Sequence, residues 1–170
     1  MTKHHNKPDL NQAQFQDTMF DHLMEKRIEH ILLICSTYDA FILEEDGRIN
    51  EAIFQEYVSL NLRYPPRFIK AHSAERALEI LESDRVDLVI NMLSISDQNP
   101  FEFSNVIKQR FANIPIVVLT PFSREVSQRL AVQDLSGVDY VFSWLGNTNL
   151  LLAIIKLIED KMNTDHDVGE

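Results

Sequence analysis

The chain has 170 residues, 45% of them hydrophobic and 25% charged, and its 16 Lys and Arg against 26 Asp and Glu give a formal net charge of −10. This composition excludes a disordered polar chain, and the longest apolar run, residues 150–155, is far too short to span a bilayer. The negative charge repels phosphate backbones and anionic lipid, so no nucleic-acid or membrane partner is expected. With a single cysteine and no signal-type N-terminus, the sequence predicts a cytoplasmic domain.

The chain opens with an extension, residues 1–28, in which an amphipathic stretch at 15–24 predicts an extra helix. Continuous apolar runs at 31–35, 86–90 and 116–119 predict strands buried on both faces, as in a parallel sheet. Weaker signals predict two more strands at 68–71 and 140–142.

Apolar spacings of three and four predict a helix after each strand. The first two carry apolar residues at 49–60 and, after a Ser73 cap, at 74–81. The third follows Pro100 with its apolar face at Phe103, Val106, Ile107 and Phe111. The fourth runs from a Ser123 cap to a left-handed terminus at Gly137, and the fifth spans about 147–162.

Five strand-then-helix repeats predict an α/β fold, because right-handed crossovers force such a chain into a parallel sheet covered by helices. The expected strand order is 2-1-3-4-5. The predicted domain covers residues 29–162, and residues 163–170 form a loose acidic tail.

Five short segments of the chain carry a resemblance to a known protein family. Residues 31–34 (Ile-Leu-Leu-Ile), 87–90 (Asp-Leu-Val-Ile), 100–103 (Pro-Phe-Glu-Phe), 115–120 (Pro-Ile-Val-Val-Leu-Thr) and 139–142 (Asp-Tyr-Val-Phe) come in the order and spacing of one domain. Together they resemble the CheY-like receiver domain of two-component response regulators, which has a flavodoxin-like fold. The resemblance implies a phosphoryl-accepting aspartate, an acidic pair that binds a divalent cation, a hydroxyl and a lysine.

Matched residue by residue, most of these functional positions differ. The acidic pair falls on Cys35 and Ser36, the acceptor on Met92 and the lysine on Ser143, whereas Thr120 keeps the hydroxyl. The resemblance therefore implies a degenerate receiver that binds no metal or cofactor and is not phosphorylated.

Two acids leave an alternative open. Asp39 follows the first strand and Asp97 follows the third, so either could serve an active receiver with an atypical aspartate. Cys35 fits a small buried hydrophobe better than a redox thiol. Only four glycines occur, none in a phosphate-binding motif, and no zinc-binding spacing is present.

The distance from Ser36 to Ala77 is about a dozen residues longer than in ordinary receivers, and the insertion includes residues 44–48. Residues 38–48 resemble a segment of receiver-like domains placed ahead of phosphoenolpyruvate synthase-like modules, which bind phosphoenolpyruvate or pyruvate.

We therefore expect regulation through protein contacts rather than catalysis, with either a protein partner or a fused output module. A ligand-sensing domain is a further alternative. The apolar arc of the fifth helix is too wide for one sheet to cover, so either the segment at 15–24 covers the rest or a second copy does. The resemblance favours a homodimer through the fourth helix, fifth strand and fifth helix, and the expected partner surface comprises Trp144, Leu150, Leu152 and Leu157.

Overall fold

The computed structural model describes residues 27–40, 55, 65–92, 98–120, 128, 131–144 and 148–167. The chain divides into two compact units, one formed by Ile28–Lys156 and the other by Met1–Arg27 with Leu157–Glu170. The predicted helix at 15–24 and the insertion at 44–48 lie outside the described residues.

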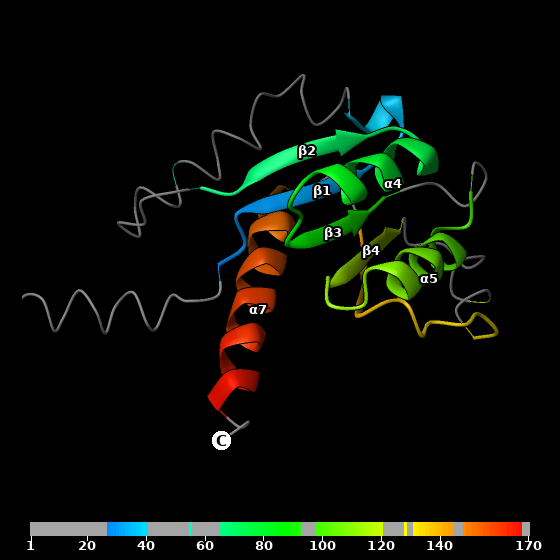
Figure 1. The fold of residues 1–170 in the computed structure, drawn as a ribbon. Helices are drawn as coiled ribbons and strands as arrows, with labels where there is room; N and C mark the ends of the chain where they lie inside the picture. The colour runs from blue at the N-terminus through cyan, green and yellow to red at the C-terminus, as the bar shows by residue number, and fades with distance from the viewer. Residues whose placement is uncertain are drawn as a thin grey trace, which may run out of the picture. The chain divides into compact units, whose positions relative to one another are not determined.

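A five-stranded parallel sheet forms the centre of the unit Ile28–Lys156 (Figure 1). Its order, β2-β1-β3-β4-β5, confirms the predicted topology. The predicted strands agree with the observed ones to within two residues at each end. Their bounds are β1 His30–Ile34, β2 Arg67–Ala71, β3 Leu88–Asn91, β4 Ile116–Thr120 and β5 Tyr140–Ser143.

The three central strands are buried along almost their whole length, which explains their continuous apolar sequences. In β1, Leu32 and Ile34 join a core with Phe103 and Ile107 of the helical layer. The alternate residues of each strand face the other side of the sheet, so both faces need cover.

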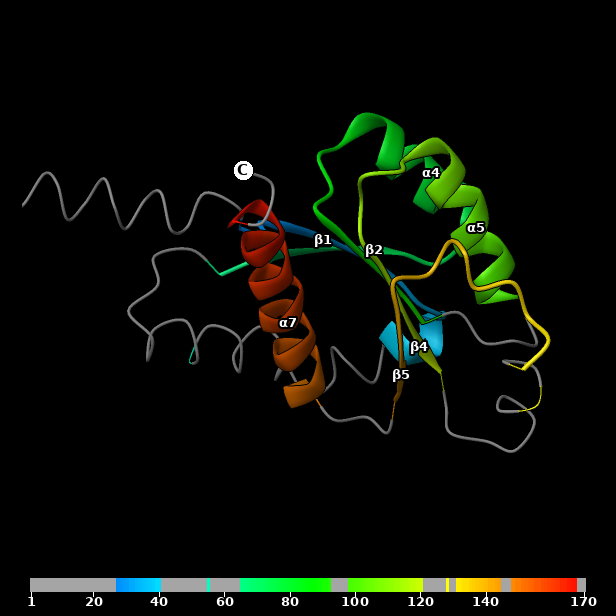
Figure 2. The same ribbon diagram turned by 90° about the horizontal axis from the view of Figure 1, so that it is seen from below.

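Two helices cover one face of the sheet (Figure 2). Helix α4, Ala74–Ser83, begins at the predicted cap, where Ser73 Oγ accepts a hydrogen bond from the Arg76 backbone N–H at 3.1 Å. Helix α5, Pro100–Arg110, is capped by Asn99, whose Oδ1 accepts from the Phe101 N–H at 2.9 Å. Each cap satisfies a backbone donor that the helix itself leaves unpaired.

Helix α7, Thr148–Asp167, begins on the opposite face of the sheet (Figure 2). Leu151, Ile154 and Ile155 are buried, as their spacing predicts. The helix continues five residues beyond its predicted end, so the tail is helical as far as Asp167. Within the described parts of the chain, every helix is too short or too polar to span a bilayer.

Two predictions about helices were wrong. Val106 was expected on the apolar face of α5 but is 43% exposed, because the buried side of that helix is set by Phe103 and Ile107. Residues 131–139 form turns and bends, so the fourth helix does not reach Gly137; its predicted start at Ser123 lies outside the described residues.

Gly137 has a φ outside the left-handed region, and close packing explains the glycine instead. A Cβ at this position would come within 2.5 Å of the Asn105 Cα and 2.7 Å of the Asn105 nitrogen. The backbone of the segment before β5 therefore passes directly against α5.

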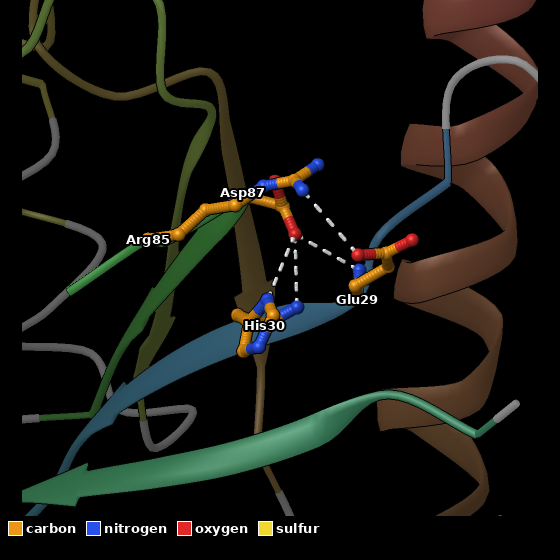
Figure 3. Close-up of polar contacts among 4 residues, drawn as sticks. All are labelled: Glu29, His30, Arg85 and Asp87. Atoms are coloured by element: carbon orange, nitrogen blue, oxygen red, sulfur yellow. Dashed lines mark hydrogen bonds and ion pairs between the residues drawn. The ribbon is translucent and has the colours of Figure 1, made fainter.

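At the amino edge of the sheet, Asp87 fixes the start of β1 (Figure 3). Its Oδ2 accepts hydrogen bonds from the backbone N–H groups of Glu29 at 3.0 Å and His30 at 2.9 Å. Arg85 completes the cluster, with Nε 3.3 Å from Asp87 Oδ1 and a terminal nitrogen 3.5 Å from Glu29 Oε2.

Asp139 fixes the start of β4 as Asp87 fixes the start of β1. Its Oδ2 accepts from the Ile116 N–H at 2.8 Å and from Lys108 Nζ at 2.7 Å, and Lys108 also donates to the Ile114 carbonyl oxygen at 2.8 Å. Two carboxylates thus hold the beginnings of two central strands.

Candidate functional site at the carboxyl edge of the sheet

The carboxyl ends of the strands meet at one edge of the sheet, where ligands of open α/β folds bind. The hydrogen-bonded ladder extends past the strand ends: the Cys35 N–H donates to the Ala71 oxygen at 3.0 Å, and the Met92 N–H donates to the Ile34 oxygen at 2.6 Å. Backbone contacts therefore hold Cys35 and Met92 at neighbouring strand ends.

The side chains at these ends are mostly buried and uncharged. Cys35, Met92 and Thr120 are all buried, whereas Ser143, the register partner of Thr120, is exposed. A thiol (Cys35), a thioether (Met92) and a hydroxyl (Ser143) stand at positions that the receiver resemblance assigns to charged groups, whereas Thr120 keeps the expected hydroxyl. None of these four side chains is an anion or cation of the kind that phosphoryl transfer uses.

Ser36 and Asp39 form a local hydrogen-bonded turn after β1. Ser36 Oγ donates to Asp39 Oδ2 at 2.8 Å and accepts from the Asp39 N–H at 3.1 Å, while the Ala40 N–H donates to the Ser36 oxygen at 2.9 Å. The half-buried Asp39 carboxylate is thus engaged within its own turn. The other candidate acid, Asp97, lies outside the described residues.

His72 also lies at this edge of the sheet. It directly follows β2, and its Nδ1 lies 3.2 Å from the carbonyl oxygen of Cys35. Because a carbonyl oxygen only accepts, Nδ1 carries the proton in this hydrogen bond. The predicted strand order could have indicated this contact, because β2 lies beside β1 and the residues that follow the two strands therefore meet.

Asn91, the last residue of β3, is fully buried and links the sheet to α5. Its Nδ2 donates to the Pro100 oxygen at 3.2 Å and to Ser104 Oγ at 3.4 Å, and Ser104 Oγ donates to the Pro100 oxygen at 2.6 Å. The Asn91 amide nitrogen therefore ties the end of β3 to the first turn of α5.

The residues at this edge do not fit a magnesium ion. Mg²⁺ requires oxygen ligands, usually including carboxylates, but Cys35 offers sulfur and Met92 a thioether. Of the two candidate acids, only Asp39 lies among the described residues, and Ser36 already bonds to it. Among the described residues, no three His, Cys, Asp or Glu side chains gather as a metal site.

The four residues expected at the partner surface differ in exposure. Trp144 and Leu150 are half-buried and Leu157 is exposed, but Leu152 is only 9% exposed, which corrects its prediction as a surface residue. With 100° per residue, the buried arc of α7 extends from Ile154 through Leu151 to Leu152. On β5, the Tyr140 and Phe142 rings stack with centroids 6.0 Å apart.

The strand order, flanking helices and edge described above define the receiver fold of response regulators, and solved structures agree. The chain is similar to the signal receiver domain of an HD domain-containing protein from Pseudomonas fluorescens Pf-5, with 19% identity over 84% of this chain and 94% of that chain and a TM-score of 0.60. A two-component response regulator from Clostridium difficile is 24% identical over 79% and 98% of the two chains, with a TM-score of 0.55.

A third similar structure is the response regulator TrrA from Thermotoga maritima, solved in complex with Mg²⁺-BeF. It is 19% identical over 76% of this chain and 97% of that chain, with a TM-score of 0.54. No family model and no curated protein matches the sequence. At these identities the likeness establishes the fold alone.

Proposed function

We propose that this chain is a regulatory, receiver-type signalling domain that has lost phosphoryl acceptance and acts through contacts with other proteins. Met92 carries the proposal: it is buried at the end of β3, at the position where the receiver resemblance places the acceptor aspartate. A thioether has no oxygen with which to form an acyl phosphate. Cys35 and Ser36 likewise supply no carboxylate for the cation that phosphoryl transfer requires.

The proposal implies a binding domain rather than an enzyme. Catalysis needs an acid, a base or a nucleophile arranged around a reacting atom. At the carboxyl edge, His72 Nδ1 is bonded to a backbone oxygen and the Asp39 carboxylate to a serine hydroxyl. The local partners of His72 Nδ1 and of the Asp39 carboxylate support a binding role for this edge.

An intact-mass experiment tests the proposal. The chain is incubated with acetyl phosphate and MgCl₂, beside an active receiver as positive control, and is expected to gain no phosphoryl group. Magnesium with beryllofluoride, the complex bound by the Thermotoga receiver, should also leave the melting temperature unchanged, since only ligands of the native state raise it.

The runner-up function, an active receiver with an atypical aspartate, predicts the opposite result. A stoichiometric phosphoryl adduct would overturn the proposal, and its loss in Asp39→Asn would identify the acceptor. Asp97→Asn is the matched second variant. A ligand-sensing role would instead appear as a rise in melting temperature with a small anion and no covalent adduct.

We further propose that the protein contacts include a homodimer formed through β5 and α7, together with the helix predicted before β5. The exposed Leu157 on α7 and the half-buried, stacked Tyr140 and Phe142 on the edge strand support it, because apolar side chains that stay accessible to solvent are typical of interfaces. A symmetric interface burying on the order of 1,600 Å² would be stable.

The resemblance of residues 38–48 to domains ahead of phosphoenolpyruvate synthase-like modules suggests what the domain regulates. We propose that its partner is such a module, either fused or separate. Reading the coding sequence beyond codon 170 and around the gene tests this directly: an unrelated output module in the same frame would overturn it.

A further inference from the structure

The sheet has two edge strands, and β2 is one of them (Figure 1). Among the described residues, its only strand partner is β1, with which it pairs in parallel from Arg67 to Ala71. An edge strand offers a row of backbone N–H and C=O groups to an extended segment of another chain. β2 is therefore a candidate for strand addition, in which a partner contributes one more strand to the sheet.

The hydrogen bonds to β1 show which backbone groups of β2 point outward. The Arg67 N–H donates to the Glu29 oxygen at 2.8 Å, and the Ala71 oxygen accepts from the Cys35 N–H at 3.0 Å. Backbone groups alternate between the two sides of a strand, so the N–H and C=O of Phe68, one residue after Arg67, point away from β1. Among the described residues, none hydrogen-bonds to the Phe68 backbone on that side. Phe68 thus presents one donor and one acceptor at the edge.

The side chains of β2 make this edge both apolar and cationic. Arg67 is exposed, whereas Phe68, Ile69 and Lys70 are half-buried. Ile69 packs against the core that includes Ala77 of α4, and because side chains alternate along a strand, Phe68 lies on the opposite face. An added strand would therefore meet an accessible aromatic ring on one face and the Arg67 cation on the other.

The sequence around β2 is basic, although the chain has a net charge of −10. Residues 57–74 contain Arg63, Arg67 and Lys70 but no Asp or Glu. Arg67 forms no ion pair with any acid among the described residues. A carboxylate from a partner would therefore supply the charge that this edge lacks.

The acids on neighbouring elements do not neutralise Arg67. Three of them are paired with other arginines: Glu29 with Arg85, Glu79 with Arg76 and Glu82 with Arg110. Two more, Glu75 in the first turn of α4 and Asp84 at its C-terminal cap, form no ion pair with Arg67 within the described structure. The positive charge at the start of β2 thus remains available to a partner.

We propose that the outer edge of β2 binds an extended, acidic segment of another protein as an additional strand. Main-chain hydrogen bonds to Phe68 would hold the segment, an apolar side chain would lie beside the Phe68 ring, and an acid would meet Arg67. A second copy of the chain fits this edge less well. Pairing β2 with β2 would bring two cations from each copy together, and charges on edge strands oppose such pairing.

This inference deepens the proposed role in protein contacts and rests on it. A single added strand fits a weak, transient complex, because stable interfaces bury far more area. The phosphorylation assay measures chemistry at the carboxyl ends of the strands, and the following experiment measures binding along β2, so either can fail without the other.

The full chain, labelled with ¹⁵N, is titrated with a capped peptide of alternating Val and Glu, and with a matched peptide of alternating Val and Lys. In a strand, the first peptide presents Val on one face and Glu on the other, which matches the opposite faces of Phe68 and Arg67. It should shift the amide signals of β2, whereas the Val-Lys peptide should not. Added salt should weaken the binding.

Hydrogen exchange distinguishes strand addition from contact with side chains alone. The Phe68 N–H would gain a hydrogen bond in the complex, so at about nine-tenths saturation it should exchange with solvent roughly tenfold more slowly. The Val-Lys peptide, at the same concentration, should leave this rate unchanged.

Two pairs of variants test the groups involved. Phe68→Ala and Phe68→Pro both remove the ring, but only proline removes the outward N–H, and an edge strand tolerates proline there. Phe68→Pro should bind the Val-Glu peptide roughly tenfold more weakly than Phe68→Ala. Arg67→Gln should weaken binding roughly threefold. Arg110→Gln, which removes the same charge from an exposed position on α5, should bind like the wild type.

Equal binding of the two peptides, signal shifts centred away from β2, or an unchanged exchange rate at Phe68 would overturn the proposal. So would equal affinities of Phe68→Pro and Phe68→Ala, equal effects of Arg67→Gln and Arg110→Gln, or no binding at millimolar peptide. The amide spectra show directly whether each variant is folded, and the comparison of the two peptides on the wild type needs no variant.

Discussion

Asp87 and His30 are joined by two hydrogen bonds that run in opposite directions. The Asp87 N–H donates to the His30 carbonyl oxygen at 2.8 Å, and the His30 N–H donates to the Asp87 side-chain oxygen Oδ2 at 2.9 Å (Figure 3). This exchange fixes where β3 begins relative to β1. His30 Nδ1 lies 3.7 Å from the same carboxylate oxygen, too far for a hydrogen bond.

Removing this anchor should destabilise the domain. We expect Asp87→Ala to lower the free energy of unfolding by about 2 kcal/mol, because the backbone donors of Glu29 and His30 both lose their acceptor. Asp87→Asn keeps one acceptor oxygen and should cost less. Urea unfolding of the wild type and the two variants measures these differences in stability. Equal stability of Asp87→Ala and the wild type would contradict the prediction.

Restoring the acceptor alone should not restore function. Met92→Asp should remain unphosphorylated by acetyl phosphate and should lose about 2–4 kcal/mol of stability, since it buries a carboxylate with no cation beside it. Met92→Leu, a volume-conserving control, should cost under about 1.5 kcal/mol. Acids at both Cys35 and Ser36 should be needed in addition before magnesium binds.

Calorimetric titration with MgCl₂ compares that triple variant with Met92→Asp. Robust phosphorylation of the single variant would show that another carboxylate already holds the cation.

The close approach at Gly137 predicts an unusual double-variant result. Gly137→Ala should destabilise by about 1–3 kcal/mol, as overpacking does. Combining it with Asn105→Ala should give no rescue, because two of the three closest atoms belong to the Asn105 backbone. Thermal unfolding of both single variants and the double variant tests this, and a double variant more stable than Gly137→Ala would refute it.

Two substitutions on α7 distinguish loss of the proposed dimer from loss of core packing. Leu157→Glu places a charge on an exposed side chain and should convert the dimer to a folded monomer by light scattering. Leu152→Glu places it on a buried side chain and should reduce stability instead. A wild type that remains monomeric at high micromolar concentration would defeat the dimer.

The central strands could be predicted because they are buried on both faces, so β1 and β4 have continuous apolar sequences. Spacing alone could not orient the helices. Val106 was expected on a buried face and Leu152 on the partner surface, yet Val106 is exposed and Leu152 is buried, because the position of the covered arc depends on what packs against the helix.

Counting along the chain predicted that Met92 stands where the third strand ends, and in the structure Met92 directly follows β3. Counting could not predict two side-chain contacts at this edge. His72 reaches Cys35 across two strands, and Asn91 turns its amide toward Pro100, nine residues later. Such contacts depend on side-chain direction, which composition and spacing leave open.

Asp87 and Asp139, the carboxylates that fix strand positions, stand at the amino edge, away from the strand ends where receivers do their chemistry. Substitutions at the carboxyl edge are therefore expected to leave the hydrogen bonds of Asp87 and Asp139 in place. The register of the strands and the chemistry of the candidate site thus depend on different residues at opposite edges of one sheet.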